Sequence, residues 1–141
     1  NHSEILYALR VRILSVIFDK HLKFHSHADH IIDKTKHALP WLIKRIKAGV
    51  RSHPRVSFYK ARILSILLYA APCWFSHTSQ NDKLKLKGFQ KLCTRIMIPY
   101  EEENEERLSL LKLEELNIHL DILCLKYIAK VCDYDDHPCK K

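Results

Sequence analysis

An apolar stretch in the middle of the chain constrains its fold more than any other feature. From Phe58 to Trp74 the sequence reads FYKARILSILLYAAPCW, with Lys60 and Arg62 in the first turns and almost no polar face thereafter. A helix that is apolar on nearly all sides must be covered by several neighbours. Pro72 predicts the end of this helix. The stretch therefore predicts a buried helix within a bundle of further helices.

The glycine content supports a helical fold. The 141 residues include two glycines, whereas average usage of about 7% would give roughly ten, which argues against a turn-rich β architecture. Apolar residues recur at helical spacing over residues 31–46, 84–97 and 108–131. The predicted fold is mainly α: a helical bundle over residues 26–141 that follows a short N-terminal β-hairpin over residues 1–25.

The hairpin is predicted from the run Leu9–Phe18, in which apolar and basic residues alternate before a β-branched segment. A polar turn is expected at Asp19–His21, and Leu22–Phe24 then supplies the second strand. Ser26 with Asp29 resembles a capping box for the next helix, which Pro40 should kink or break. The signals expected to cap or end the later segments are Gly49, Ser79 or Asn81, and Pro99.

Charge is distributed unevenly along the chain. Residues 1–99 hold 18 Lys and Arg against 5 Asp and Glu, a net charge of +13, whereas residues 100–141 hold 6 against 11, a net charge of −5. A dense positive field attracts phosphates, although a solvated surface has the same composition. The candidate nucleic-acid-binding residues form one group around a helix-loop-helix junction and one stripe on a later helix. They are Lys44, Arg45, Lys47, Arg51, Arg55, Lys60 and Arg62, and Lys83, Lys87, Lys91 and Arg95.

No catalytic residue is predicted. The sequence has neither a glycine-rich phosphate loop nor a nucleophile elbow, and Tyr134–Asp136 resembles a polymerase motif without the apolar strands that would flank it. A histidine cluster includes a His-x-His-x-x-His spacing but no paired cysteines, so surface or helix-capping histidines are favoured over metal ligands. A metal-dependent hydrolase is the least favoured alternative. The cluster comprises His21, His25, His27, His30 and His37, with Asp29 and Asp33.

Core packing is the expected role of Trp41, Tyr59, Tyr69 and Trp74, in preference to stacking on bases. Five cysteines spread singly through apolar positions, with no secretion signal, favour a reduced intracellular location in the nucleus or cytoplasm. The longest apolar run is 13 residues, against the roughly 20 that a bilayer span requires, so no membrane partner is expected. The chain begins without methionine and is expected to be part of a longer protein.

Several motifs occur in a recognisable order. They are Leu14–Ser15–Val16, Phe18–Asp19, Leu22–Lys23–Phe24, His27, His30–Ile31, Phe58–Tyr59–Lys60, Leu68–Tyr69–Ala70–Ala71–Pro72–Cys73–Trp74, Leu86, Phe89–Gln90–Lys91, Arg95–Ile96 and the leucine-rich segment Leu110–Ala129. This order resembles the region after the catalytic palm in reverse transcriptases of non-LTR retrotransposons, the jockey-type elements in particular. Ser15 stands where that family has a glycine, and Pro40 interrupts a helix that is usually continuous there.

The resemblance implies a non-catalytic part of an RNA-directed DNA polymerase. The hairpin would correspond to the primer grip, and the helices to the thumb and the helical region that follows it. The implied partners are an RNA-DNA or DNA duplex, held by its phosphate backbone, and the palm and fingers of the same polymerase. The catalytic aspartates and their two divalent metal ions would lie upstream of Asn1, so no cofactor is expected in this chain. The alternative is a structural or protein-interaction helical bundle from an inactive retroelement remnant.

Overall fold

The computed structural model describes residues 10–49, 52–101 and 103–133. The fold is mainly α and begins with a two-stranded antiparallel hairpin, which confirms the predicted fold class. The elements in chain order are β1 (Arg10–Ile13), β2 (Val16–Asp19), α1 (His25–Lys36), α2 (Leu39–Lys47), α3 (Ser52–Phe58), the π-helix η1 (Tyr59–Leu64), α4 (Ser65–Leu68), α5 (Ala71–Trp74), the 3-10 helix η2 (Phe75–His77), α6 (Gln80–Met97), α7 (Asn104–Leu111) and α8 (Leu116–Asp133).

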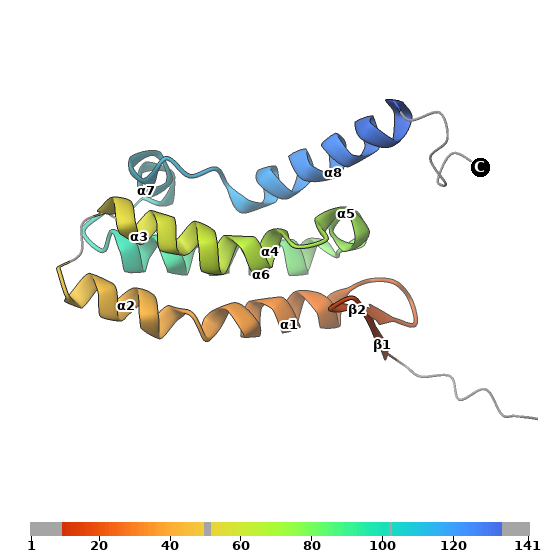
Figure 1. The fold of residues 1–141 in the computed structure, drawn as a ribbon, viewed down its shortest axis with the longest axis horizontal. Helices are drawn as coiled ribbons and strands as arrows, with labels where there is room; N and C mark the ends of the chain where they lie inside the picture. The colour runs from red at the N-terminus through yellow and green to blue at the C-terminus, as the bar shows by residue number, and fades with distance from the viewer. Residues whose placement is uncertain (1–9, 50–51, 102, 134–141) are drawn as a thin grey trace, which may run out of the picture.

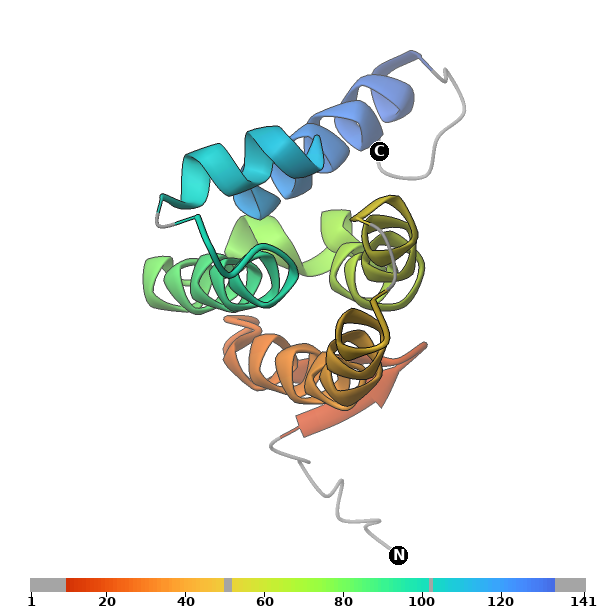
Figure 2. The same ribbon diagram turned by 90° about the vertical axis from the view of Figure 1, so that its left-hand side faces the viewer.

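The helices form three layers. In Figure 1, α1 and α2 follow one another along the lower edge, and α3, η1 and α4 run back above them. Figure 2 shows that this returning segment and α6 lie side by side, between the α1–α2 layer and the layer of α7 and α8. The buried core draws on all three layers: Leu42, Tyr59, Ile63, Leu67, Trp74, Phe75, Leu86, Met97, Leu116 and Leu120.

The hairpin turns at Leu14 and Ser15, so the predicted turn at Asp19–His21 is wrong. The two turn residues have φ of 46° and 67°, the positive values that a two-residue type I′ turn requires. Ser15 thus adopts the backbone conformation that a glycine adopts without strain. The expected second strand, Leu22–Phe24, instead lies in the connection to α1.

The boundaries of α1 and α2 are partly as predicted. Pro40 lies in the first turn of α2, where its missing N–H costs no hydrogen bond, and the helical segment breaks just before it. Gly49 follows α2 with a φ of 72°, as expected for a helix-ending glycine. The predicted capping box of Ser26 and Asp29 is wrong. α1 already begins one residue before Ser26, with left-handed Phe24 at the cap position and no side-chain cap.

The stretch from Phe58 to Trp74 is not one helix. α3 begins upstream, η1 widens into a π-helix, and the chain turns at Tyr69 and Ala70 before α5 starts. Pro72 lies in the first turn of α5, so its predicted role as the end of a helix is wrong. α4 ends at Leu68, before the proline. A helix that continued from α4 past Pro72 would bring the proline ring against the carbonyl group of Leu68, four residues earlier. The stretch is nevertheless buried as predicted at Tyr59 and at Ile63, Leu67 and Trp74.

α6 begins at the predicted cap, because Ser79 Oγ accepts a hydrogen bond from the Asp82 N–H at 3.2 Å. It ends before Pro99, also as predicted. Two of its predicted apolar-face residues are exposed instead: Leu84 by 59% and Leu92 by 44%. The α6 surface that the other layers cover is therefore narrower than the sequence suggests.

The last helical region consists of two helices. Lys112 follows α7 with a φ of 51°, and α8 starts after a short connection. Gln90 of α6 fixes this connection: its Nε2 donates to the Glu114 carbonyl at 2.8 Å, and its Oε1 accepts from the Leu116 N–H at 2.7 Å. No helix within the described residues is long and apolar enough to cross a membrane.

Candidate nucleic-acid interface

A cation-lined groove lies between the α1–α2 layer and the returning segment of α3, η1 and α4. Its volume is about 520 Å³. The α2 groove, as we name it, is lined by Lys34, His37, Ala38, Trp41, Arg45, Phe58, Arg62 and Ile66. Three of these residues are Lys or Arg, all of them exposed, and none is Asp or Glu. The lining thus combines positive charge with an aromatic and aliphatic floor.

The helical spacing of α2 brings an indole and two cations together. Trp41, Lys44 and Arg45 are three and four residues apart, so their side chains share one side of the helix. The Lys44 ammonium lies 5.8 Å from the centroid of the Trp41 ring, and the Arg45 guanidinium lies 5.3 Å from that of Phe58. Both distances are within the range of cation-π attraction. Arg45 is thus held within the groove and Lys44 beside it, and none of the described lining residues carries a carboxylate.

The π-helix η1 distributes its two basic residues to different surfaces. Arg62 lines the α2 groove, whereas Lys60 lines a separate hollow of about 250 Å³ beside Lys112 and Glu114. The predicted junction cluster is therefore divided in space.

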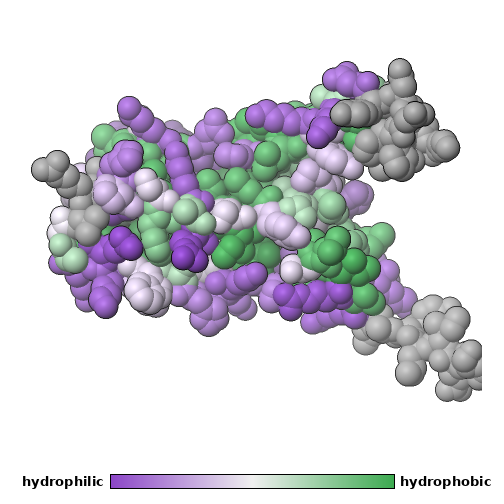
Figure 3. Space-filling model, in the orientation of Figure 1, coloured by the Kyte–Doolittle hydropathy of each residue, from purple (hydrophilic) through white to green (hydrophobic). Residues whose placement is uncertain are grey.

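On the face shown in Figure 3, hydrophilic side chains cover α1 and α2 along the lower edge, and hydrophobic patches lie above them.

The remaining residues of that predicted cluster have other surroundings. Arg55 is half-buried, and its Nη1 donates to the carbonyl oxygen of Met97 at 3.2 Å, at the end of α6. Lys47 is exposed at the end of α2 but does not line the groove, and Arg51 lies outside the described residues. Of the seven predicted junction residues, the structure thus brings Arg45 and Arg62 together in one groove, with Lys44 beside it.

Part of the predicted stripe on α6 faces acidic residues. Lys87 forms an ion pair with Glu115 at 3.1 Å, and together with Lys91 it lines a hollow of about 640 Å³. Glu103, Glu105 and Glu115 line the same hollow. The two other stripe residues differ from this pair: Lys83 Nζ lies 4.6 Å from the centroid of the Phe75 ring, and Arg95 is exposed. The stripe is thus separate from the α2 groove and partly neutralised within the chain.

Lys34, His37 and Trp41 are polar or aromatic residues of the groove that the sequence did not predict as binding residues. Trp41 is 61% exposed and Tyr69 is 52% exposed, so their predicted place in the core is wrong, whereas Tyr59 and Trp74 are fully buried as predicted. A periodic signal was present. Lys34, His37, Trp41 and Arg45 recur every three or four residues, which places them along one side even across the break before α2.

Another hollow continues from the α2 groove toward the hairpin. Its volume is about 280 Å³, and it shares Lys34 and Ile66 with the groove. His27 lines it too, although the residue is only 1% exposed. The Tyr69 hydroxyl, from the same lining, donates to the Leu14 carbonyl oxygen at 3.0 Å and so links the hairpin turn to the helices.

The predicted histidine spacing does not form one site. His27 is buried: its Nδ1 accepts from the Ile17 N–H at 3.3 Å, and its ring lies edge-on to Trp74, with the centroids 5.1 Å apart. Burial, with the positive charge of His30, lowers the pKa of His27 to about 4. The expectation of a surface or capping histidine is wrong at this position.

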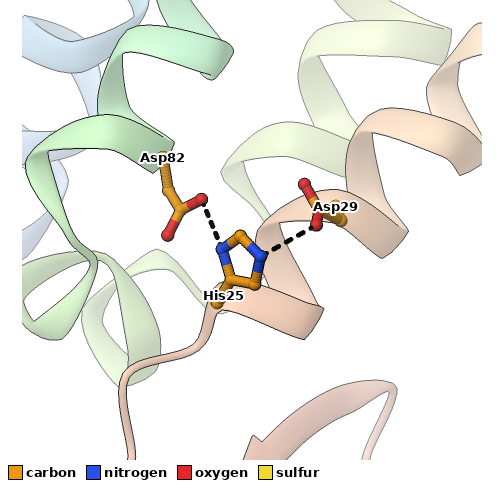
Figure 4. Close-up of side chains that lie close together, drawn as sticks. All are labelled: His25, Asp29 and Asp82. Carbon is orange, nitrogen blue, oxygen red and sulfur yellow. Dashed lines mark hydrogen bonds and ion pairs between the residues drawn. The ribbon is translucent and has the colours of Figure 1, made fainter.

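His25 belongs to a different cluster, with Asp29 and Asp82 (Figure 4). Its ring nitrogens lie 2.7 Å from Asp82 Oδ1 and 3.3 Å from Asp29 Oδ2. The Lys85 ammonium lies 2.8 Å from Asp29 and 3.3 Å from Asp82. Burial by itself raises the pKa of Asp82, but hydrogen bonds from Ser79 and His25 outweigh it and lower the pKa below its usual value. These side chains form an ion-pair network that joins the start of α1 to the start of α6.

Comparison with known proteins identifies no relative: no family model, no curated protein and no solved structure matches this chain. The resemblance to reverse transcriptases stays a prediction from the order of the sequence motifs.

Proposed function

We propose that this chain holds a nucleic-acid duplex by its phosphates, as the primer-grip and thumb part of a retroelement RNA-directed DNA polymerase whose catalytic residues lie elsewhere. The α2 groove is the observation that supports binding. Exposed Lys34, Arg45 and Arg62 lie along one groove with Lys44 beside it, and no residue that the structure describes in the lining is acidic. The partners under this proposal are an RNA-DNA or DNA duplex and the palm and fingers of the same polymerase.

Phosphate binding follows from the chemistry of this lining. Guanidinium groups form bidentate hydrogen bonds with phosphate oxygens, and each neutralised phosphate releases condensed counterions. Arg45 is steadied over the Phe58 ring, so less side-chain freedom is lost when it binds. Such contacts position a backbone without reading its sequence, and we therefore expect similar affinity for duplexes of different sequence.

The test is duplex binding as a function of salt. A fluorescein-labelled RNA-DNA duplex is titrated with the chain at several salt concentrations, and anisotropy gives the dissociation constant. Arg45→Gln with Arg62→Gln should weaken binding and reduce the magnitude of the log-log salt slope by about 1.8, because each phosphate that is no longer neutralised lowers the slope by about 0.9. Lys126→Gln with Lys130→Gln on α8 removes the same charge from exposed positions away from the groove and is the matched control.

Two results would overturn this proposal. One is undetectable duplex binding at low salt. The other is an equal loss of affinity in the groove variant and the α8 variant, which would show that only net charge matters. Circular dichroism of each variant confirms that the helices are retained.

One observation favours the alternative of a protein-interaction bundle. Leu125 and Ile128 in the second half of α8 are 64% and 56% exposed, although the first half of the helix buries Leu116 and Leu120. If α8 is an interaction surface between copies of the chain, sedimentation velocity should show association that rises with protein concentration. Leu125→Lys with Ile128→Lys should then restore a monomer. A monomer at every concentration would contradict self-association.

A further inference from the structure

The α2 groove has a feature that phosphate binding does not use: the exposed indole of Trp41. Its side of α2 is left open, with 61% of the residue exposed, although tryptophan gains more from burial than any smaller apolar side chain. The chain's other tryptophan, Trp74, is completely buried. Packing within the described residues does not explain the exposure of Trp41. The open indole is available to contact a ligand.

The groove presents aromatic rings and cations together. Lys44 lies over the Trp41 ring at 5.8 Å, and Arg45 lies over the Phe58 ring at 5.3 Å. Arg62 lines the same groove from η1. Aromatic platforms bordered by cations are how proteins hold single-stranded nucleic acid, because every base has a π-face and every nucleotide carries a phosphate. The groove volume of about 520 Å³ lies within the range of about 300–1,000 Å³ typical of small-molecule pockets.

From these contacts we infer that the α2 groove binds an unpaired nucleotide, with its base stacked on Trp41 and its phosphate held by Arg45 and Arg62. This inference rests on the proposed function, because it assigns a single-stranded subsite to a duplex-holding surface. Within a duplex, each base is already covered by its stacked neighbours, so the indole has access only to an unpaired or terminal base. The subsite therefore favours a duplex that carries a single-stranded extension.

The positive charge of the groove favours a nucleotide, which carries a phosphate, over an uncharged flat ligand. Among its described residues the lining contains Lys34, Arg45 and Arg62 and no Asp or Glu, so an uncharged aromatic ligand would not neutralise these cations. An acidic peptide would satisfy the charge but would offer no base to the indole. Competition by an oligoglutamate separates these two occupants.

The test compares one RNA-DNA duplex in blunt form with the same duplex carrying a short single-stranded overhang. The overhang form should bind about tenfold more tightly, as expected for one stacked base. Trp41→Ala should make the two forms bind with equal affinity and so abolish this difference. Trp41→Phe, which keeps an aromatic ring, should retain part of it. The overhang should also quench the fluorescence of the wild-type chain, and Trp41→Ala, whose remaining tryptophan is the buried Trp74, should show no quenching.

The possible results separate the unpaired-nucleotide subsite at Trp41 from duplex binding by the α2 groove as a whole. Equal affinity for blunt and overhang duplexes, or a tenfold preference that survives in Trp41→Ala, overturns the inference and leaves the duplex-holding proposal standing. Displacement of the overhang duplex by oligoglutamate as effectively as by an oligonucleotide of equal charge also overturns it. Failure of the wild-type chain to bind any duplex at low salt overturns both the inference and the proposed function.

Discussion

The folded chain should lose stability in mild acid because of one buried histidine. His27 is 1% exposed, and its Nδ1 accepts the Ile17 N–H at 3.3 Å, an interaction that requires a neutral imidazole. Burial and the charge of His30 lower its pKa to about 4 in the folded chain. In the unfolded chain, where no burial acts, its pKa returns to about 6.5.

The size of the effect follows from proton linkage. Between the two pKa values the unfolded state binds one more proton than the folded state, so stability falls as the pH falls. The loss begins near the unfolded pKa of about 6.5 and is complete below the folded pKa of about 4. Between about pH 7 and about pH 4.5 the His27 contribution should fall by roughly 2 kcal/mol, at about 1.36 kcal/mol for each pKa unit. This is a large part of the roughly 5–15 kcal/mol that stabilises a typical domain.

Urea unfolding of the wild-type chain and of His27→Asn at these two pH values measures this contribution. Asparagine keeps an acceptor near the position of Nδ1 but does not titrate, so the variant should lose about 2 kcal/mol less than the wild-type chain between the two pH values. Asp19, Asp33 and Asp82, whose pKa values are lowered, affect both proteins alike. His37→Asn, at an exposed position, is the control and should behave as the wild-type chain does. An equal loss of stability in wild type and His27→Asn would refute the reasoning.

Substitutions at three further positions test how the helices begin and how they are joined. Gln90→Met should lower the free energy of unfolding by about 3 kcal/mol, because it leaves the Leu116 N–H and the Glu114 carbonyl without partners; a urea-measured change below about 0.5 kcal/mol would contradict this role. Ala70→Gly should stabilise the chain by about 0.5 kcal/mol, because residue 70 has a φ of 51°; a lower melting temperature would count against it. Ser79→Ala should cost about 1 kcal/mol by removing the cap of α6 and the hydrogen bond to Asp82, whereas Ser79→Thr keeps the hydroxyl and should keep most of the stability.

The fold class and several helix boundaries could be predicted because local chemistry determines them. Pro40 cannot donate the backbone hydrogen bond of a helix interior, and Gly49 adopts positive φ without strain, so both mark the ends of segments in nearly any context. Ser79 offers its hydroxyl to the first unpaired N–H groups of α6. These signals act within one turn of helix and need no information about distant residues.

The breaks that the sequence did not indicate share one property. Leu14, Ala70 and Lys112 adopt positive φ although none of them is glycine or asparagine. Such residues leave the right-handed region only when contacts elsewhere repay the strain. The Tyr69 hydroxyl bonds to the Leu14 carbonyl, and Gln90 holds the chain just beyond Lys112. These contacts join residues that are far apart in sequence, so no local pattern reveals them.

The candidate site was harder to predict than the fold. The number of basic residues in a segment indicates its charge, but it does not show on which surface each side chain lies. Lys60 and Arg62 are neighbours in sequence, yet they line different hollows because they belong to different sides of η1. Hydropathy likewise predicts burial for Trp41 and Trp74 alike, whereas the structure buries Trp74 completely and leaves Trp41 61% exposed. Leu42, the next residue of α2, is completely buried, so the side of the helix on which a residue lies decides its burial. Trp41 thus lies on the open side of α2, and substitution of this residue tests the unpaired-nucleotide subsite most directly.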